Sequence, residues 1–335
     1  MAGESEMSLP TNDELYRWIC RNEAPPEDRN YLPGQIEAVR TWWQELKQHS
    51  KDNDLLEAVF DGDCKAHFHE RFWELYLPKA FATAGIALNR GKSGQPDFNF
   101  EKHGQKIWIE AVACGEPTVE HNKVPPPGDD FESGLNSAFE NQTMQRLATA
   151  ISLKINGFQK KQRDGIVQAE DIYVIALNGW RALNGQLQDS VWAWGQSVPQ
   201  TWQPPFIVRM LFGMGDQFLQ LDPQSHDPIG VGFQQIGKIK LGAPIAHFTK
   251  PENSGIAGVL YSAANIFETR RDILGHDFIF IPNPYAKDVS SIFNSMQVRE
   301  SLAPGAGLKP LPIRGLDAAA GRIYHSAPKK ISRAE

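Results

Sequence analysis

The sequence is poor in cysteine and has no long apolar run. Its three cysteines, Cys20, Cys64 and Cys114, lie far apart and form no CxxC pair, which argues against a disulfide framework and a cysteine-based zinc site. No stretch approaches the roughly 18 apolar residues that span a bilayer, and the acidic N-terminus lacks the apolar core of a signal peptide. We therefore expect reduced thiols in a cytoplasmic protein that is neither secreted nor membrane-bound.

Surplus positive charge is also missing, because the net charge is −6. Non-specific affinity for duplex DNA comes largely from Lys and Arg that neutralise phosphates, so a broad phosphate-binding surface is not expected. Any contact with nucleic acid must use a local basic patch. With 335 residues, of which 41% are hydrophobic, the chain has enough apolar material for one sizeable α/β domain with additions.

The chain divides into four segments by composition and pattern. Residues 1–62 are expected to form an N-terminal helical addition, with helix from about residue 11 to residue 49. Residues 63–180 carry the order helix, hairpin, helix, strand of an α/β core. Residues 181–300 are expected to extend the same domain, and residues 301–335, rich in Pro, Gly, Ala and basic residues, to form a loosely ordered tail.

Within the core, a helix over residues 64–84 precedes two strand-like runs, PDFNFEK and QKIWIEAVA, which are separated by a short His-Gly turn. A loop rich in Pro, Gly and Asp covers residues 116–130. A long amphipathic helix is expected over residues 133–161, and a strand buried on both faces over residues 171–178. Further strands are expected in PPFIVRMLFG, GIAGVLYSAANIF and DFIFIPNP.

Two carboxylates face each other if the turn between the strand-like runs has two residues. The register then pairs Lys102 with Gln105 and Asp97 with Glu110, which places both acids on one face. Opposite side chains lie roughly 4.5–5.5 Å apart at Cβ, where two like charges destabilise a sheet. A bridging divalent cation reverses that sign, because hard cations such as Mg²⁺ bind carboxylate oxygens. The alternative is a solvent-facing acidic pair partnered by Lys or Arg.

A third acid comes from the preceding helix. At about 100° per residue, Glu70 and Glu74 fall within the apolar stripe that contains Leu77, Phe81 and Ala84. Carboxylates on a core-facing stripe are unfavourable unless they are paired, hydrogen-bonded or metal-bound. For both acids, the alternative is an ion pair or a helix cap without chemistry.

These residues, in this order, resemble the core of the PD-(D/E)XK nuclease superfamily over residues 66–178. Glu74 matches the helical glutamate of that family, Pro96-Asp97 matches PD, and Glu110 matches the (D/E) position. More narrowly, the ELYL, PDF, WIEAVA, IALN and NPYA phrases look like a bacterial branch of the superfamily. The resemblance implies a restriction-endonuclease-like core with a central mixed sheet flanked by helices. It also implies that the three acids hold Mg²⁺ or Mn²⁺ for phosphodiester hydrolysis, with DNA favoured over RNA by family habit, in bacterial defence.

The lysine of the family signature is missing, because Val112 occupies its place two residues after the second acid. That lysine normally helps to position the attacking water and to stabilise developing charge. Lys106 shares the strand face of Glu110 but lies about 13 Å away, at about 3.3 Å per residue. This separation is too large for Lys106 to substitute easily.

A better replacement is Lys154, which falls within the apolar stripe of the long helix with Leu147, Ile151 and Phe158. The resemblance places this helix beside the strands that carry the acids. We therefore expect the Lys154 ammonium within about 4–6 Å of a carboxylate, with Gln142 and Arg146 nearer a bound phosphate. The alternative is that Lys154 extends to the helix rim and that its stem covers apolar surface.

Two further groups of residues are not expected to form a functional site. His67 and His69 lack metal-ligand spacing, because residues two apart on a helix point in different directions, and solvated histidines are expected. Three tryptophans have no interleaved Lys or Arg and are more typical of a core or an interface than of base stacking: Trp192, Trp194 and Trp202.

The expected function is a metal-dependent nuclease, and two alternatives stay open. The first is a catalytically inactive PD-(D/E)XK-like module that binds nucleic acid or protein, which Val112 and the acidic net charge favour. The second is a phosphoesterase for small molecules. The sequence leaves the oligomeric state open, with a homodimer among the alternatives.

Overall fold

The computed structural model describes residues 32–49, 64–114, 137–183, 206–221, 224, 228–238, 244–265, 274–275, 278–287, 316–317 and 322–323. Several predictions lie outside these ranges. They are the helix before residue 32, the loop over residues 116–130, the tryptophan cluster and most of the C-terminal tail. Among the helices that the structure describes, none is both long enough and apolar enough to cross a membrane.

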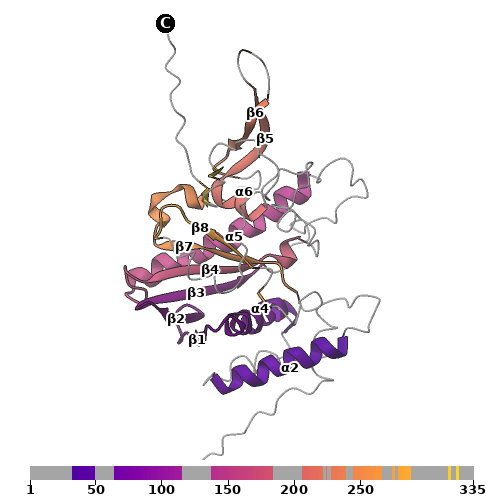
Figure 1. Cartoon of the computed structure of the whole chain (residues 1–335), viewed down its shortest axis with the longest axis vertical. Coiled ribbons are helices and arrows are strands. Elements are labelled where there is room, and N and C mark those ends of the chain that lie inside the picture. The colour runs from indigo at the N-terminus through magenta and orange to yellow at the C-terminus, as the bar shows by residue number, and fades with distance from the viewer. Residues whose placement is uncertain are drawn as a thin grey trace, which may run out of the picture.

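A six-stranded mixed sheet lies at the centre of the structure, with the strand order β1-β2-β3-β4-β7-β8 (Figure 1). Strands β1, β2 and β3 are antiparallel, β3, β4 and β7 run parallel, and β8 is antiparallel to β7. The strands are β1 (Asn89–Arg90), β2 (Phe98–Lys102), β3 (Gln105–Ala113), β4 (Ile172–Asn178), β7 (Ile256–Ser262) and β8 (Ile279–Pro282). The expected α/β class is confirmed.

The hairpin of β2 and β3 has the predicted register, since Lys102 pairs with Gln105. The two residues of its turn have φ angles of 53° and 72°, and positive φ at both positions suits the twist of a two-residue hairpin. Continuing this register by one residue places Asp97, directly before β2, across from Glu110. The geometric basis for pairing the two acids is therefore present.

Helices cover both faces of the sheet (Figure 1). Helix α4 (Cys64–Thr83) packs on one face, where its side chains share a core with Ile107 and Ile109 of β3, and α2 (Leu32–His49) adds Val39 and Trp42 to this core. Helix α5 (Ser137–Arg163) packs on the other face, where its side chains share a core with Trp108 of β3. Because successive side chains of a strand point to opposite faces, Glu110 faces α5.

Strands β4, β7 and β8 agree with the predictions from their apolar runs. All residues of β4 and of β7 are buried, as expected for strands covered on both faces. Strand β8 lies within the predicted run DFIFIPNP. The expected helix over residues 64–84 is α4, and the expected long helix over residues 133–161 is α5, whose predicted residues 133–136 lie outside the described ranges.

The predicted strand in PPFIVRMLFG is wrong, because its residues form helix α6 (Phe206–Phe212). Every residue of α6 is buried, so the run has no polar face whose period would distinguish a helix from a strand. Gly213 follows the helix with a φ of 64°, the left-handed conformation that often ends helices.

Among the described residues, two small sheets lie outside the central one. Strands β5 (Met214–Leu221) and β6 (Pro228–Gln235) form a separate two-stranded sheet. In the C-terminal segment, β9 (Leu316–Asp317) pairs with β10 (Arg322–Ile323).

His247, in the 3-10 helix η5 (His247–Thr249), gives the fold a pH dependence. The residue is buried, and its Nε2 lies 3.0 Å from the Ser152 hydroxyl oxygen. Burial, with the nearby charge of Lys250, lowers the pKa of His247 from its usual 6.5 to about 4, so the folded protein keeps the ring neutral.

We expect the free energy of unfolding to fall as the pH drops from 6.5 towards 4, because only the unfolded chain takes up this proton. The loss attributable to His247 should reach about 3 kcal/mol. Urea unfolding at several pH values measures it. His247→Gln should flatten this part of the profile, and equal slopes in the two proteins would contradict the assignment.

Candidate functional site

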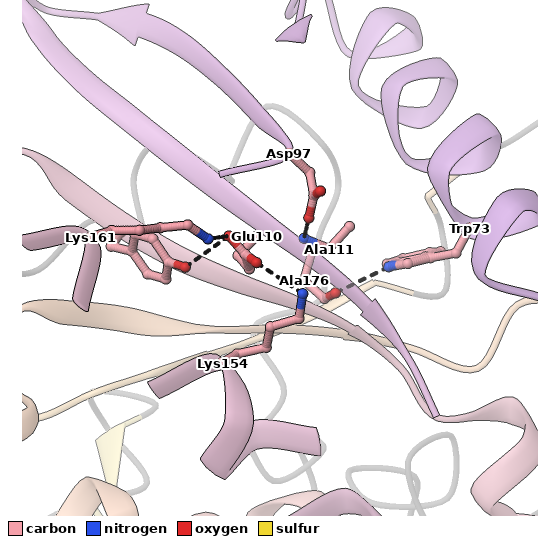
Figure 2. A network of polar contacts seen from close by, with 8 residues as sticks. Trp73, Asp97, Glu110, Ala111, Lys154, Lys161 and Ala176 are labelled. Carbon is pink, nitrogen blue, oxygen red and sulfur yellow. Dashed lines mark hydrogen bonds and ion pairs between the residues drawn. The ribbon is translucent and has the colours of Figure 1, made fainter. Parts of the chain in front are cut away.

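Glu110 lies at the centre of a polar network on the α5 side of the sheet (Figure 2). Its Oε1 accepts a hydrogen bond from Lys154 Nζ at 2.9 Å, and its Oε2 accepts one from Lys161 Nζ at 2.6 Å. Both lysines come from α5. The Tyr173 hydroxyl, on the neighbouring strand β4, donates to Oε2 at 3.0 Å. The carboxylate is thus held by three donors, of which two are charged.

This network fixes the protonation states of its members. Burial alone would raise the pKa of Glu110, but Lys154 and Lys161 together hold it below its usual value. The same pairing raises the pKa of Lys154, although burial opposes it. Burial and the charge of Glu110 raise the pKa of Tyr173, so its hydroxyl remains a donor. At neutral pH Glu110 is therefore an ionised carboxylate, Lys154 an ammonium group and Tyr173 a neutral phenol.

Asp97 has a different environment, although the extended hairpin register places it across from Glu110. Burial raises its pKa to about 6; the charges of Glu110 and Glu74 act in the same direction, and Lys154 opposes them. Asp97 Oδ2 accepts a hydrogen bond from the backbone N–H of Ala111 at 2.8 Å (Figure 2). This bond holds Asp97 against β3 beside Glu110. The repulsion expected between the two acids is therefore present, and a bound cation would relieve it.

Glu74, on α4, borders the site but has a partner of its own. Its Oε2 lies 3.5 Å from Nη2 of Arg90, and its charge acts on Asp97. The ion pair considered for Glu74 is thus present. Glu70, one helical turn earlier, contributes to the field at Lys154. Within the described ranges, no three His, Cys, Asp or Glu side chains gather closely enough to form a ready-made metal centre.

The predicted position of Lys154 is confirmed, because its ammonium contacts Glu110 and acts on Asp97. Val112 packs partly buried against the α5-side core. Lys106 Nζ lies 4.0 Å from the ring centroid of Trp108, in a cation–π contact.

The two residues expected near a phosphate have different outcomes. The side chain of Gln142 lies outside the described residues. Arg146 is partly buried on α5 and acts on Cys114, the residue after β3. Burial raises the pKa of the Cys114 thiol to about 12, with Arg146 opposing, so this cysteine is not a ready nucleophile.

Sequence reasoning missed Lys161 and Tyr173, although each carried a signal. Lys161 follows Lys154 by about two helical turns, which puts both ammonium groups on one face of α5. Tyr173 belongs to a run predicted to be buried on both faces, where a hydroxyl needs a partner.

The expectation of solvated histidines is wrong for His69. This residue is only 3% exposed, and its Nε2 lies 2.9 Å from Asn178 Oδ1. Because an amide oxygen only accepts, Nε2 carries the proton. The ring also stacks on Phe72, one turn further along α4. The hydrogen bond to Asn178 gives His69 a structural contact with the end of β4.

Glu110→Gln is expected to lower the free energy of unfolding by about 2–3 kcal/mol, because it removes the anion between two largely buried ammonium groups. Urea unfolding at pH 7.5 with EDTA measures the change. Glu170→Gln, at an exposed position, is the matched control. A loss no larger than that of the control would show that the lysines relax into solvent.

Comparison with protein-family models, with curated proteins and with solved structures gives no match to this chain. The chemistry available at the site therefore follows from its own side chains. Asp97 and Glu110 offer hard oxygen ligands for a cation such as Mg²⁺ or Mn²⁺. Lys154 and Lys161 offer positive charge to an anion such as a phosphate.

Proposed function

We propose that this protein is a metal-dependent nuclease of the PD-(D/E)XK type, with a restriction-endonuclease-like core. One observation carries the proposal: Lys154 contacts Glu110, and Asp97, bonded to β3 beside Glu110, feels the charges of both, with the acids in the family order. DNA hydrolysis in the bacterial cytoplasm, as part of defence against foreign DNA, belongs to the same proposal. The resemblance supplies those details.

The residues of the site fit a divalent cation. Asp97 and Glu110 are neighbouring carboxylates. Burial and then the charge of Glu110 raise the pKa of Asp97, and such a pair favours a bound cation. Asp97 and Glu110 would ligate it directly, and Glu74 would act through water or orient the nucleophile. When bound, Mg²⁺ or Mn²⁺ supplies activation of water and neutralisation of the leaving oxyanion.

Lys154 takes the role of the signature lysine, whose position Val112 occupies. Its pKa is raised, so the side chain is a stable ammonium group and acts by charge rather than as a general base. From its place beside Glu110 Oε1, it would stabilise negative charge that develops on the phosphate and help to orient the attacking water. Tyr173 and Lys161 hold the other carboxylate oxygen, which fixes the orientation of Glu110.

The test is incubation of the purified protein with plasmid, linear duplex DNA, single-stranded DNA and RNA. Each substrate is tested with Mg²⁺, with Mn²⁺ and with EDTA. We expect cleavage of at least one polymer that EDTA abolishes. Hydrolysis of a small phosphodiester with no cleavage of any polymer would favour the small-molecule phosphoesterase instead. No hydrolysis of any substrate would overturn the proposal.

A specific observation favours a second candidate, a binding module without activity. Glu110 already has three hydrogen-bond donors, and Val112 removes the usual lysine. Fluorescence anisotropy with labelled DNA and RNA in EDTA tests this candidate. Binding without metal, combined with no cleavage under any condition, would support it.

A further inference from the structure

Two lysines contact one of the two paired acids. Asp97 and Glu110 are the paired acids, and Lys154 and Lys161 are the cations in contact with Glu110. Figure 2 shows the two lysines reaching Glu110 from different directions, with Asp97 on a third side. Lys161 makes the shorter contact, at 2.6 Å against 2.9 Å for Lys154.

Building on the proposed function, we propose that Lys161 is an internal cation that weakens metal binding at Asp97 and Glu110 until a phosphate group is present. Metal and phosphodiester then bind together. Lys161 is not placed against the reacting atoms. It acts through Glu110, whose Oε2 it contacts.

The physical reason is the repulsion between like charges in a largely buried site. The side chain of Glu110 is 8% exposed and that of Lys161 is 17% exposed, so water screens their charges only in part. A divalent cation on Glu110 would lie close to the ammonium group of Lys161, which lowers the affinity for the metal. A phosphodiester brings negative charge that offsets the two lysines. By thermodynamic linkage, the phosphate and the metal then raise each other's affinity by the same factor.

Tyr173 allows the charge of Lys161 to be separated from its effect on orientation. Both side chains donate to Glu110 Oε2, but only the lysine is charged. Lys161→Met removes the charge and leaves Tyr173 to orient the carboxylate. Tyr173→Phe removes a neutral donor and leaves the charge. If Lys161 acted only as a clamp, both substitutions would weaken metal binding.

The experiment is calorimetric titration of the full chain with Mn²⁺, alone and with saturating dimethyl phosphate, a phosphodiester that the enzyme is not expected to consume during the titration. For the native chain we expect dimethyl phosphate to raise the Mn²⁺ affinity about 5-fold or more. For Lys161→Met we expect about 5-fold tighter binding of Mn²⁺ alone and a smaller gain from dimethyl phosphate. Lys161→Arg should behave like the native chain.

Lys160→Met is the matched control, since it removes the same charge from an exposed neighbouring position on α5. Its Mn²⁺ affinity should stay close to that of the native chain. Mn²⁺ binding to Lys161→Met that is no tighter than to the native chain would overturn the inference and leave the proposed function standing. The absence of Mn²⁺ binding in every protein would overturn both. If Lys161→Met does not fold, the native chain alone decides, because no effect of dimethyl phosphate on its Mn²⁺ affinity contradicts the coupling.

Discussion

Asp97→Asn is expected to abolish cleavage and at the same time to stabilise the metal-free protein. Cleavage should be lost because the amide takes away one of the two anions that would hold the cation. The fold should gain because burial and the charge of Glu110 disfavour the ionised Asp97, whose pKa is raised from 3.8 to about 6. The oxygen of the new amide can still accept the hydrogen bond from the backbone N–H of Ala111. We expect a gain of about 1–2 kcal/mol at pH 7.5.

The direction of the pH dependence follows from the raised pKa. Above about pH 6 the folded native chain carries the unfavourable charge, so the stability advantage of Asp97→Asn is complete. As the pH falls from 6 towards 3.8, the folded protein binds this proton before the unfolded chain does, and the advantage disappears.

Nuclease assays and thermal melts with EDTA or Mg²⁺ measure both effects of Asp97→Asn. The native chain should gain stability from Mg²⁺, and the variant should lose most of that gain. Asp164→Asn, an exposed position near the end of α5, is the control for the change from acid to amide. Unchanged cleavage by a pure Asp97→Asn preparation would reject the assignment of Asp97. Loss of the Mg²⁺-dependent gain alone would support metal binding without establishing catalysis.

The parts of the fold that the sequence predicts are those specified by local rules. A two-residue turn sets the register of β2 and β3, and this register follows from counting residues once the turn is located. The fully apolar run of β4 indicates burial on both faces wherever its neighbours come from. Helix α6 shows the limit of such rules, because a short run that is buried on every side carries no periodic signal.

The candidate site was predictable in its positions but not in its pairings. The apolar stripe of α5 indicated that the Lys154 ammonium needs a partner, and the register indicated which acids share a face. The partner of each charge depends on tertiary packing. Nothing local connects Glu74 with Arg90, or Lys161 and Tyr173 with the same oxygen of Glu110. These contacts determine how much negative charge the site would present to a bound cation.

Lys154→Met tests whether Lys154, from α5, takes the role of the signature lysine whose position Val112 occupies. Methionine keeps most of the stem, so packing beside Ile151 and Phe158 in the α5-side core should persist. Glu110 keeps Lys161 and Tyr173 as donors, so its orientation should persist as well. We expect turnover to fall by about 10²–10³-fold, the usual effect of losing one electrostatic stabiliser.

Single-turnover cleavage and equilibrium DNA binding separate the contribution of Lys154 to chemistry from its contribution to affinity. The loss should lie mainly in the cleavage rate, and Lys160→Met, which removes an exposed charge from the same helix, should cleave at close to the native rate. Val112→Lys in the Lys154→Met background places an ammonium group where the PD-(D/E)XK signature has its lysine, on the same strand face as Glu110, and should recover part of the rate. Unaltered cleavage by Lys154→Met would reject the replacement. If the native chain shows no cleavage of its own, Val112→Lys tests whether the missing lysine is the reason. A Val112→Lys chain that still does not cleave would favour the binding module, because a lysine at the signature position should restore activity to a nuclease site that lacks only this residue.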